Sequence, residues 1–296
     1  MRILLLGANG QVGFELQCSL APLGDVVYAT RTGEEGTLAA DLGDAALLRA
    51  ALDSASADIV VNAAAYTAVD RAEDEPVLAQ RINGDALGDI GAWAKSRGAL
   101  VVHYSTDYVF DGSGKRPYRE DDATAPLGVY GSSKLAGENA LRVSGCDHVI
   151  LRTAWVYASR GKNFLLTMLK VGAERDSLRV VDDQLGTPTS ARLIADVTAT
   201  IIAAGRTKLG TYHLCASGEC TWHAFAQAIF ARACETGLIA RVPRVEAIAT
   251  ADYPTKAARP RYSVLDTSKL RAAFGVDLPS WQHGFDHVIA ELARNK

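Results

Sequence analysis

The chain has 296 residues, of which 48% are hydrophobic and 22% charged, as is typical of a globular protein with one large or two small domains. A net charge of −3 and the lack of any Lys/Arg run exclude the basic surface that a nucleic-acid-binding protein needs. The N-terminal apolar run 3–6 ends at Gly7 and is too short for a signal peptide or a membrane span. We therefore expect a cytoplasmic protein without a membrane partner.

The cysteines and histidines do not suggest a metal site. The cysteines are odd in number and scattered, and they lack Cys-x-x-Cys spacing, so they predict reduced thiols in a cytosolic protein. We expect no metal site from the six histidines. The five cysteines are Cys18, Cys146, Cys215, Cys220 and Cys234.

The first half of the chain alternates short apolar runs with amphipathic segments. Runs that are hydrophobic on both faces are typical of buried parallel strands. A β-α-β-α order predicts an α/β fold of Rossmann type, in which helices cover both faces of a doubly wound parallel sheet. We expect strands at 3–6, 26–29, 59–65, 100–104 and 149–151, and helices at 11–21, 44–53, 75–97 and 130–143.

The sequence pattern changes after about residue 216, where candidate strands become sparse and prolines cluster. Before that point we expect two further strands, and helical patterns continue to the end of the chain. The strands are expected at 178–181 and 211–215, and the helices at 163–173, 190–204, 221–236, 267–274 and 281–294.

These patterns predict two domains. Residues 1–155 and 190–216 are expected to form the domain that contains the parallel sheet. The segment 156–189 carries loop signals such as "SRGKN" and "GTPTS" and is expected to leave the sheet and return. Together with residues 217–296 it is expected to form a smaller, helix-rich domain.

The first strand is followed at once by three glycines and an amphipathic helix. Gly7, Gly10 and Gly13 let the backbone approach a pyrophosphate, and the helix that begins beside Gln11 and Val12 offers unpaired N–H groups to it. The position between a strand and a helix supports dinucleotide binding more strongly than the glycines alone. The GxxGxxG spacing points to the short-chain dehydrogenase/reductase type rather than to simple two-domain dehydrogenases.

The end of the second strand indicates which dinucleotide binds. An acid at this position would bind the adenosine ribose and repel a 2′-phosphate, whereas this strand ends in Thr30 and Arg31. Arg31 could pair with a phosphate, which favours NADPH over NADH, although a solvated surface arginine stays open. Asp41 and Leu42 are expected near the adenine, and Ala63, Ala64 and Ala65 leave room for the cofactor after the third strand.

Tyr130 and Lys134 lie one helical turn apart in "VYGSSKLAGENA". A phenol has an ordinary pKa of about 10, and an ammonium one turn away would lower it. The pair could therefore serve proton transfer, or two common residues could have this spacing by accident. The pair alone does not decide between these interpretations.

The chain resembles the dTDP-4-dehydrorhamnose reductase family within the extended short-chain dehydrogenases/reductases. The stretches "GANGQVGFELQ", "NAAAYTAVDRAE", "STDYVFDG", "YGSSKLAGE", "DDQLGTPTSA" and "ARPRYSVLDTSKL" carry this resemblance over nearly the whole chain. The resemblance implies reduction of the 4-keto group of the nucleotide sugar dTDP-4-dehydro-L-rhamnose by a nicotinamide hydride. It also implies that the second domain binds the nucleotide sugar.

The resemblance also assigns roles to residues. It implies a catalytic trio of Thr106, Tyr130 and Lys134, in which Tyr130 protonates the ketone oxygen, Lys134 keeps the phenol acidic and holds the nicotinamide ribose, and Thr106 orients the oxygen. In many relatives the first residue of the trio is serine, which offers the same hydroxyl. Asp107 is placed at the substrate edge, and Trp155 lines the sugar site unless it belongs to the core.

Three further residues have weaker signals. Arg259 and Arg261 in "ARPRYS" could bind the substrate diphosphate or could be surface charges. His103 lies inside an apolar strand and is interpreted as a core histidine with satisfied hydrogen bonds rather than a catalyst.

One departure from the family concerns magnesium. Some relatives form dimers through a magnesium site made of glutamates, and Glu15 and Glu291 match two of those positions. The third position is Arg192, whose positive charge would repel a metal ion. We therefore expect no metal site, and a monomer or a homodimer built in another way.

Two alternatives remain at this stage. A nucleotide-sugar epimerase, or a reductase for a different 4-keto sugar, would share the glycine loop and the Tyr/Lys pair. A non-catalytic regulatory subunit on the same fold belongs to another class, and the intact Thr106, Tyr130 and Lys134 argue against it.

Overall fold

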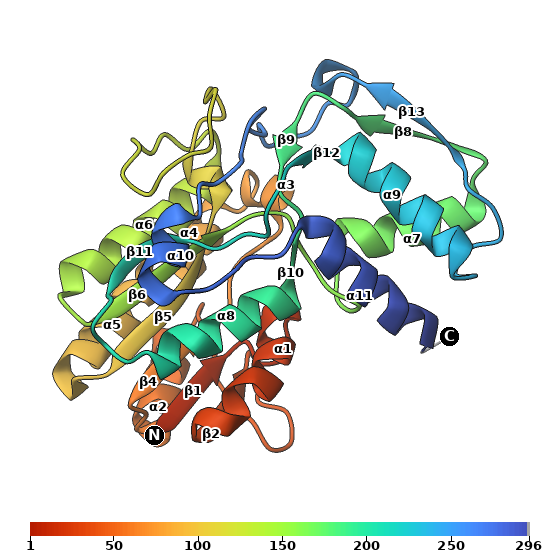
Figure 1. Ribbon diagram of the computed structural model, residues 1–296. Helices are drawn as coiled ribbons and strands as arrows, with labels where there is room; N and C mark the ends of the chain where they lie inside the picture. The colour runs from red at the N-terminus through yellow and green to blue at the C-terminus, as the bar shows by residue number, and fades with distance from the viewer. Residues whose placement is uncertain (295–296) are drawn as a thin grey trace.

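A seven-stranded parallel sheet forms the centre of the molecule (Figure 1). The computed structural model describes residues 1–294. The strands lie in the order β11-β6-β5-β4-β1-β2-β3, and every pairing in this sheet is parallel. The predicted α/β fold of Rossmann type is confirmed. The strands are β1 (Arg2–Leu6), β2 (Asp25–Thr30), β3 (Leu38–Ala39), β4 (Ile59–Asn62), β5 (Leu100–Thr106), β6 (His148–Thr153) and β11 (Gly210–His213).

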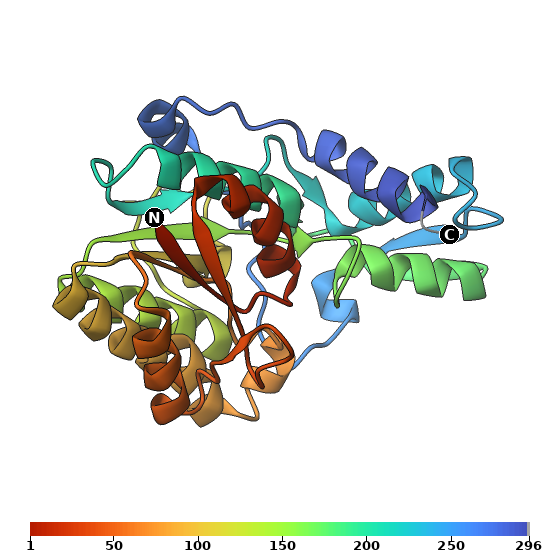
Figure 2. The ribbon, with the colours of Figure 1, turned by 90° about the horizontal axis from the view of Figure 1, so that it is seen from below.

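Helices cover both faces of this sheet, as Figures 1 and 2 show. Successive strand residues point to opposite faces, so Leu5 packs in one buried cluster and its neighbours Leu4 and Leu6 pack in another. One face is covered by α1 (Gln11–Leu20) and α8 (Ala191–Ala203), and the other by α2 (Ala45–Ala55), α5 (Ala86–Arg97) and α6 (Val129–Ser144). This double covering explains why the strands are apolar on both faces.

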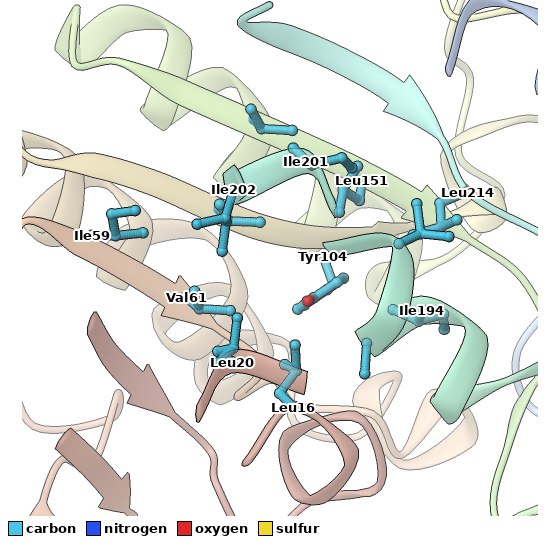
Figure 3. Close-up of a cluster of buried hydrophobic side chains, with 14 of the residues drawn as sticks. Leu16, Leu20, Ile59, Val61, Tyr104, Leu151, Ile194, Ile201, Ile202 and Leu214 are labelled. Atoms are coloured by element: carbon cyan, nitrogen blue, oxygen red, sulfur yellow. The ribbon is translucent and has the colours of Figure 1, made fainter. Parts of the chain in front are cut away.

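Figure 3 shows the cluster on the α1 and α8 face. Leu16 and Leu20 of α1 meet Val61 of β4 and Tyr104 of β5, all of them buried. Burial of each such leucine contributes about 1.5–3 kcal/mol to stability. The Tyr104 hydroxyl satisfies its hydrogen bond inside this cluster, 2.8 Å from Thr198 Oγ1 of α8.

The second half of the chain forms a smaller unit beside the carboxyl ends of the strands (Figure 1). Its core joins α7 (Phe164–Glu174), α9 (Trp222–Glu235) and α11 (Trp281–Arg294) around Phe225 and Phe230. The sequence did not predict β13, in which the charged Arg244 and Glu246 interrupt the apolar residues. Three two-stranded sheets border this core: β8 (Ser177–Val181) with β13 (Arg244–Ile248), β7 (Val156–Tyr157) with β10 (Thr189–Ser190), and β9 (Leu185–Gly186) with β12 (Cys220–Thr221).

Part of the range 217–296 packs on the large sheet instead. In α10 (Ser268–Phe274), Leu270 is buried in the cluster that contains the strand residues, and Phe274 packs against Tyr212 of β11. Leu278 belongs to the same cluster. The chain therefore returns to the large sheet before it enters α11 (Figure 2).

The helix predicted over 75–97 is divided into three pieces. It begins as α4 (Pro76–Gln80), widens to a π-helical turn at η2 (Arg81–Asp85) and continues as α5. The Asn83 side chain in this turn binds the backbone N–H and C=O of Tyr66 and donates to Ser133 Oγ of α6. The close packing of α6 on this turn depends on Gly137, where a Cβ would lie 2.1 Å from the Asn83 carbonyl oxygen.

The remaining helical turns are short. They are η1 (Ala21–Leu23), α3 (Val69–Ala72), η3 (Asp107–Val109) and η4 (Thr250–Asp252). Within residues 1–294 no helix has both the length and the apolar character that a membrane crossing requires. The five cysteines form no disulfide bond with one another.

Candidate active site

The candidate site lies where the strand order reverses, between β1 and β4. The chain winds from β1 to β3 in one direction and from β4 onward in the other, and open α/β sheets bind ligands at such a point. A cavity of about 670 Å³ opens there. It brings together most of the predicted cofactor residues with two of the catalytic trio. The lining includes Gly7, Gly10, Gln11, Val12, Arg31, Asp41, Leu42, Ala63, Ala64, Ala65, Tyr130 and Lys134.

The glycine loop leaves no room for larger side chains. Gly7 has a φ of +75°, and a Cβ there would lie 2.7 Å from the Ala64 backbone nitrogen. A Cβ on Gly13 would lie 2.0 Å from the Gly7 carbonyl oxygen, so Gly13 supports the turn from outside the cavity. Gly10 precedes α1 and offers no side-chain cap, which leaves the first N–H groups of α1 available to an anion. This loop fits the diphosphate of a dinucleotide.

Thr30 and Arg31 have different surroundings. Thr30 is buried, and its hydroxyl accepts hydrogen bonds from the backbone N–H groups of Gly33 and Glu34, so it shapes the loop rather than lining the cavity. Arg31 is exposed and lines the cavity. The same wall also carries Glu34, whose carboxylate accepts a hydrogen bond from Asn9 of the glycine loop at 3.2 Å. Sequence reasoning missed this acid because it follows the strand end by four residues.

Arg31 and Glu34 predict opposite effects on cofactor choice. Replacing Arg31 by alanine is expected to lower kcat/KM for NADPH about ten- to hundredfold, since charge-assisted hydrogen bonds contribute about 1.5–3 kcal/mol, while NADH changes little. Glu34→Ala is expected to raise kcat/KM for NADPH relative to kcat/KM for NADH, because it removes a negative charge from the same wall of the cavity. Initial rates with both cofactors measure these ratios. Equal losses for NADPH and NADH in Arg31→Ala would contradict a role in binding the 2′-phosphate.

Tyr130 and Lys134 stand in the first two turns of α6, and both line the cavity. Lys134 is 2% exposed, and its ammonium donates to the Tyr104 carbonyl oxygen at 2.6 Å and lies 3.2 Å from His103 Nε2. Burial lowers the pKa of Lys134 to about 8, while the Glu138 carboxylate acts in the opposite direction. Lys134 is thus close to its titration range at neutral pH.

The phenol of Tyr130 has a raised pKa rather than the lowered one that the spacing suggested. Burial raises the pKa of Tyr130 to about 12, and a hydrogen bond with the Thr106 hydroxyl opposes this increase. The negative charge of Asp107 raises it further. Loss of solvation therefore outweighs the neighbouring polar groups, and the phenol keeps its proton at neutral pH.

Thr106 is the last residue of β5 and Asp107 follows it, and both are buried. The Thr106 hydroxyl donates to Asp107 Oδ1 at 3.0 Å and accepts from the Tyr108 backbone N–H. Burial raises the pKa of Asp107 to about 6. The ring of Tyr108 packs edge-on against Tyr130 with 5.5 Å between centroids. Thr106 and Asp107 thus approach the Tyr130 phenol from beside the cavity and do not line it.

Trp155 lies in the second unit's core and is partly exposed. Its ring stacks on Trp222 with centroids 3.4 Å apart, and a Cβ on Gly186 would lie 2.3 Å from the ring. Trp155 has a φ of +47°, which is uncommon for a bulky residue and marks local backbone strain. The structure therefore holds this indole firmly between β6 and β7.

The two arginines near the C-terminal end of the chain are both paired with acids. Arg259 makes a two-pronged ion pair with Asp70 of α3, at 3.0 and 2.9 Å, and is half-buried. Arg261 is exposed and lies 3.5 Å from Asp183. His103 is fully buried, as predicted for a core histidine, but it contacts Lys134 directly.

The acids expected at a metal site lie beside an arginine. Arg192 Nη1 is 3.8 Å from Glu15 Oε2, and Ser159 donates to Glu291 at 2.7 Å. Burial and then the charge of Glu291 raise the pKa of Glu15, while Arg192 lowers it. Among the described residues no group of three or more His, Cys, Asp or Glu side chains could hold a metal ion. Arg192 thus places a positive charge beside Glu15.

Comparison with known proteins identifies the family. Residues 1–294 match the family model described as the RmlD substrate binding domain. The chain belongs to this family. The dTDP-4-dehydrorhamnose reductase of Escherichia coli strain K12 is 47% identical over 99% of this chain and 98% of its own length. That of Burkholderia thailandensis is 46% identical over 99% of both chains. The family resemblance inferred from the sequence motifs is confirmed.

Solved structures of the family have the same fold. The dTDP-4-dehydrorhamnose reductase of Clostridium acetobutylicum is 36% identical, covers 99% of both chains and has a TM-score of 0.90. That of Bacillus anthracis, solved in complex with NADP, is 33% identical, covers 98% of this chain and 99% of its own, and has a TM-score of 0.89. NADP in a family member agrees with the glycine loop described above.

Sequence reasoning missed several residues that shape this site in the family fold. Asn62, Asn83 and Glu138 are buried polar residues that bind His103, Tyr66 and Arg152. Asn62 lies 41 residues from its partner, Asn83 lies 17 and Glu138 lies 14, so none of these contacts falls within one helical turn or one strand. A polar side chain in an otherwise apolar strand, such as Asn62 after "DIVV", was the one local signal available.

Proposed function

We propose that this chain reduces the 4-keto group of dTDP-4-dehydro-L-rhamnose by hydride transfer from NADPH or NADH, which yields dTDP-L-rhamnose. The observation that carries the proposal is a single cavity that joins the glycine loop to Tyr130 and Lys134. The names of the close relatives supply the substrate. Free, scattered cysteines support a cytoplasmic setting.

The residues would hold the cofactor in order along the cavity. Gly7, Gly10, Gln11, Val12 and the N-terminus of α1 would bind the diphosphate, with Gly13 behind them as support. The bound nicotinamide supplies the hydride. The adenosine end would lie beside Arg31, Asp41 and Leu42, and Thr30 would shape the loop. Ala63, Ala64 and Ala65 also line the cavity and would leave room for the cofactor.

Tyr130 is the proton donor of this proposal. A hydride added to a ketone carbon leaves an alkoxide, which is a stronger base than a phenolate. A phenol with a pKa of about 12 therefore gives up its proton favourably, and it stays protonated at neutral pH until the alkoxide forms. Thr106 orients the oxygen through its hydroxyl, and the ammonium of Lys134 stabilises the phenolate that results.

The second unit is proposed to bind the nucleotide sugar. The domain proposed for this role is residues 156–189 and 217–296, from which α10 and Leu278 depart because they pack on the large sheet. Asp107 follows β5 and Trp155 follows β6, at the carboxyl ends of these strands. Arg259 is a candidate for the diphosphate, and its ion pair with Asp70 would open as the phosphate replaces the carboxylate. The Rossmann domain of this proposal is residues 1–155 and 190–216.

The assay for this function follows the absorbance of the reduced cofactor. The protein is mixed with dTDP-4-dehydro-L-rhamnose and either NADPH or NADH. Consumption that depends on the sugar, with dTDP-L-rhamnose as product, is the expected result. No turnover with either cofactor would overturn the proposal.

The oligomeric state is proposed to be independent of magnesium. The guanidinium of Arg192 beside Glu15 repels a divalent cation, so the protein is expected to be a monomer or a homodimer without a bridging metal. Light scattering before and after addition of a chelator is expected to give the same mass. A dimer that dissociates on chelation would contradict this.

A further inference from the structure

A buried row of polar side chains leads to Lys134, and two of its members, Asn62 and His103, have no role in the proposed reaction. Asn62 of β4, His103 of β5 and Lys134 of α6 are 1%, 0% and 2% exposed. Asn62 Nδ2 lies 3.2 Å from His103 Nδ1, and His103 Nε2 lies 3.2 Å from Lys134 Nζ. The row ends at the Tyr104 carbonyl oxygen, which accepts from Nζ.

The hydrogen bond that orients the Asn62 amide determines where the protons of this row lie. The Asn62 Oδ1 atom accepts a hydrogen bond from the Ala64 backbone N–H at 3.1 Å, so the amide nitrogen of Asn62 faces His103. His103 Nδ1 must then accept, and in a neutral imidazole the proton lies on Nε2. That N–H points at Lys134 Nζ.

This N–H discriminates between the two forms of Lys134. An ammonium has three donors and no lone pair, so it cannot accept from His103, whereas a neutral amine can. We propose that His103, oriented by Asn62, is a positioning residue that favours the amine form of Lys134 and thereby sets the alkaline limit of activity. The proposal deepens the proposed function, because the ammonium form is the one that stabilises the phenolate of Tyr130.

The other charges around Lys134 do not replace this effect. Glu138 lies one turn further along α6 and favours the ammonium, but Arg152 of β6 and Arg142 of α6 bind its carboxylate. The carboxylate of Asp107 raises the pKa of the neighbouring Tyr130. In agreement with the geometry, burial and then Lys134 hold the pKa of His103 well below its usual value, so the imidazole stays neutral.

The kinetic test compares two variants of His103. His103→Met removes the N–H that disfavours the ammonium form, so the pKa of Lys134 is expected to rise. The alkaline limit of kcat is then expected to move up by about one pH unit. His103→Gln can accept from Asn62 and still present an N–H to Lys134, so its limit is expected to stay in place. An unchanged limit in His103→Met would overturn the proposal, as would an equal upward move in both variants.

A control and a second measurement separate this role from stability. Thr198→Val removes a buried hydrogen bond to Tyr104 but does not face Lys134, so its alkaline limit is expected to match that of the unaltered protein. Nitrogen NMR of histidine-labelled protein, with His103→Gln to assign the signal, reports the tautomer without turnover. A proton on Nε2 is expected, and a proton on Nδ1 would overturn the proposal even if the protein does not reduce the sugar.

Discussion

Tyr130→Phe is expected to lower kcat about 10²- to 10⁴-fold, the usual contribution of a positioned general acid. The variant keeps the ring that packs edge-on against Tyr108 but removes the hydroxyl that interacts with Thr106. Cofactor affinity is expected to change little, because the glycine loop and α1 are untouched. Steady-state rates with the keto sugar, together with a binding titration of NADPH, measure the two effects separately.

The control for this variant is Tyr212→Phe. Tyr212 lies on β11 at the far edge of the sheet, and its hydroxyl donates to the Lys208 carbonyl oxygen at 3.3 Å. Loss of this hydroxyl is expected to leave kcat unchanged. A near-normal rate in Tyr130→Phe would remove the phenol from the mechanism and leave water as the proton source.

Glu138→Gln is expected to cost about 3–5 kcal/mol of folding free energy, because it leaves a buried guanidinium without its counter-charge. Glu138 is 0% exposed and receives two hydrogen bonds from the buried Arg152, at 2.9 and 2.8 Å, and one from Arg142 at 2.7 Å. Thermal and denaturant unfolding measure the loss. A change below about 1 kcal/mol would show that the amide replaces the carboxylate without cost.

The matched control is Glu235→Gln. Glu235 pairs with Arg232 at 2.8 Å on the exposed side of α9, where solvent screens the two charges and the pair contributes little to stability. The Glu138 effect also depends on pH. Arg152 holds the pKa of Glu138 below its usual 4.5 despite the opposing effect of burial, so this contribution is full above pH 4.5 and is lost as pH falls through the folded-state pKa. The difference in unfolding free energy between the unaltered protein and Glu138→Gln is therefore expected to become smaller below pH 4.5.

The sequence predicted the features that depend on local spacing. The glycine loop, the strands of the large sheet other than β3 and the Tyr130–Lys134 pair all follow from residues within one turn or one strand of each other. The direction of the Tyr130 pKa shift did not follow, because burial depends on how α6 packs against β5. The acid Glu34, the π-helical turn around Asn83 and strand β13 likewise depend on partners distant in sequence.

The ion pair of Glu138 and Arg152 also determines how α6 is rotated about its own axis. Tyr130, Lys134 and Glu138 follow one another at intervals of four residues and so share one stripe of the helix. A shift of a single residue would turn this stripe by about 100°, away from β6 and from the buried guanidinium. Because that contact forms when the chain folds, the phenol and the amine are aimed at the cavity before any ligand arrives. Substrate binding energy is then not spent on ordering them.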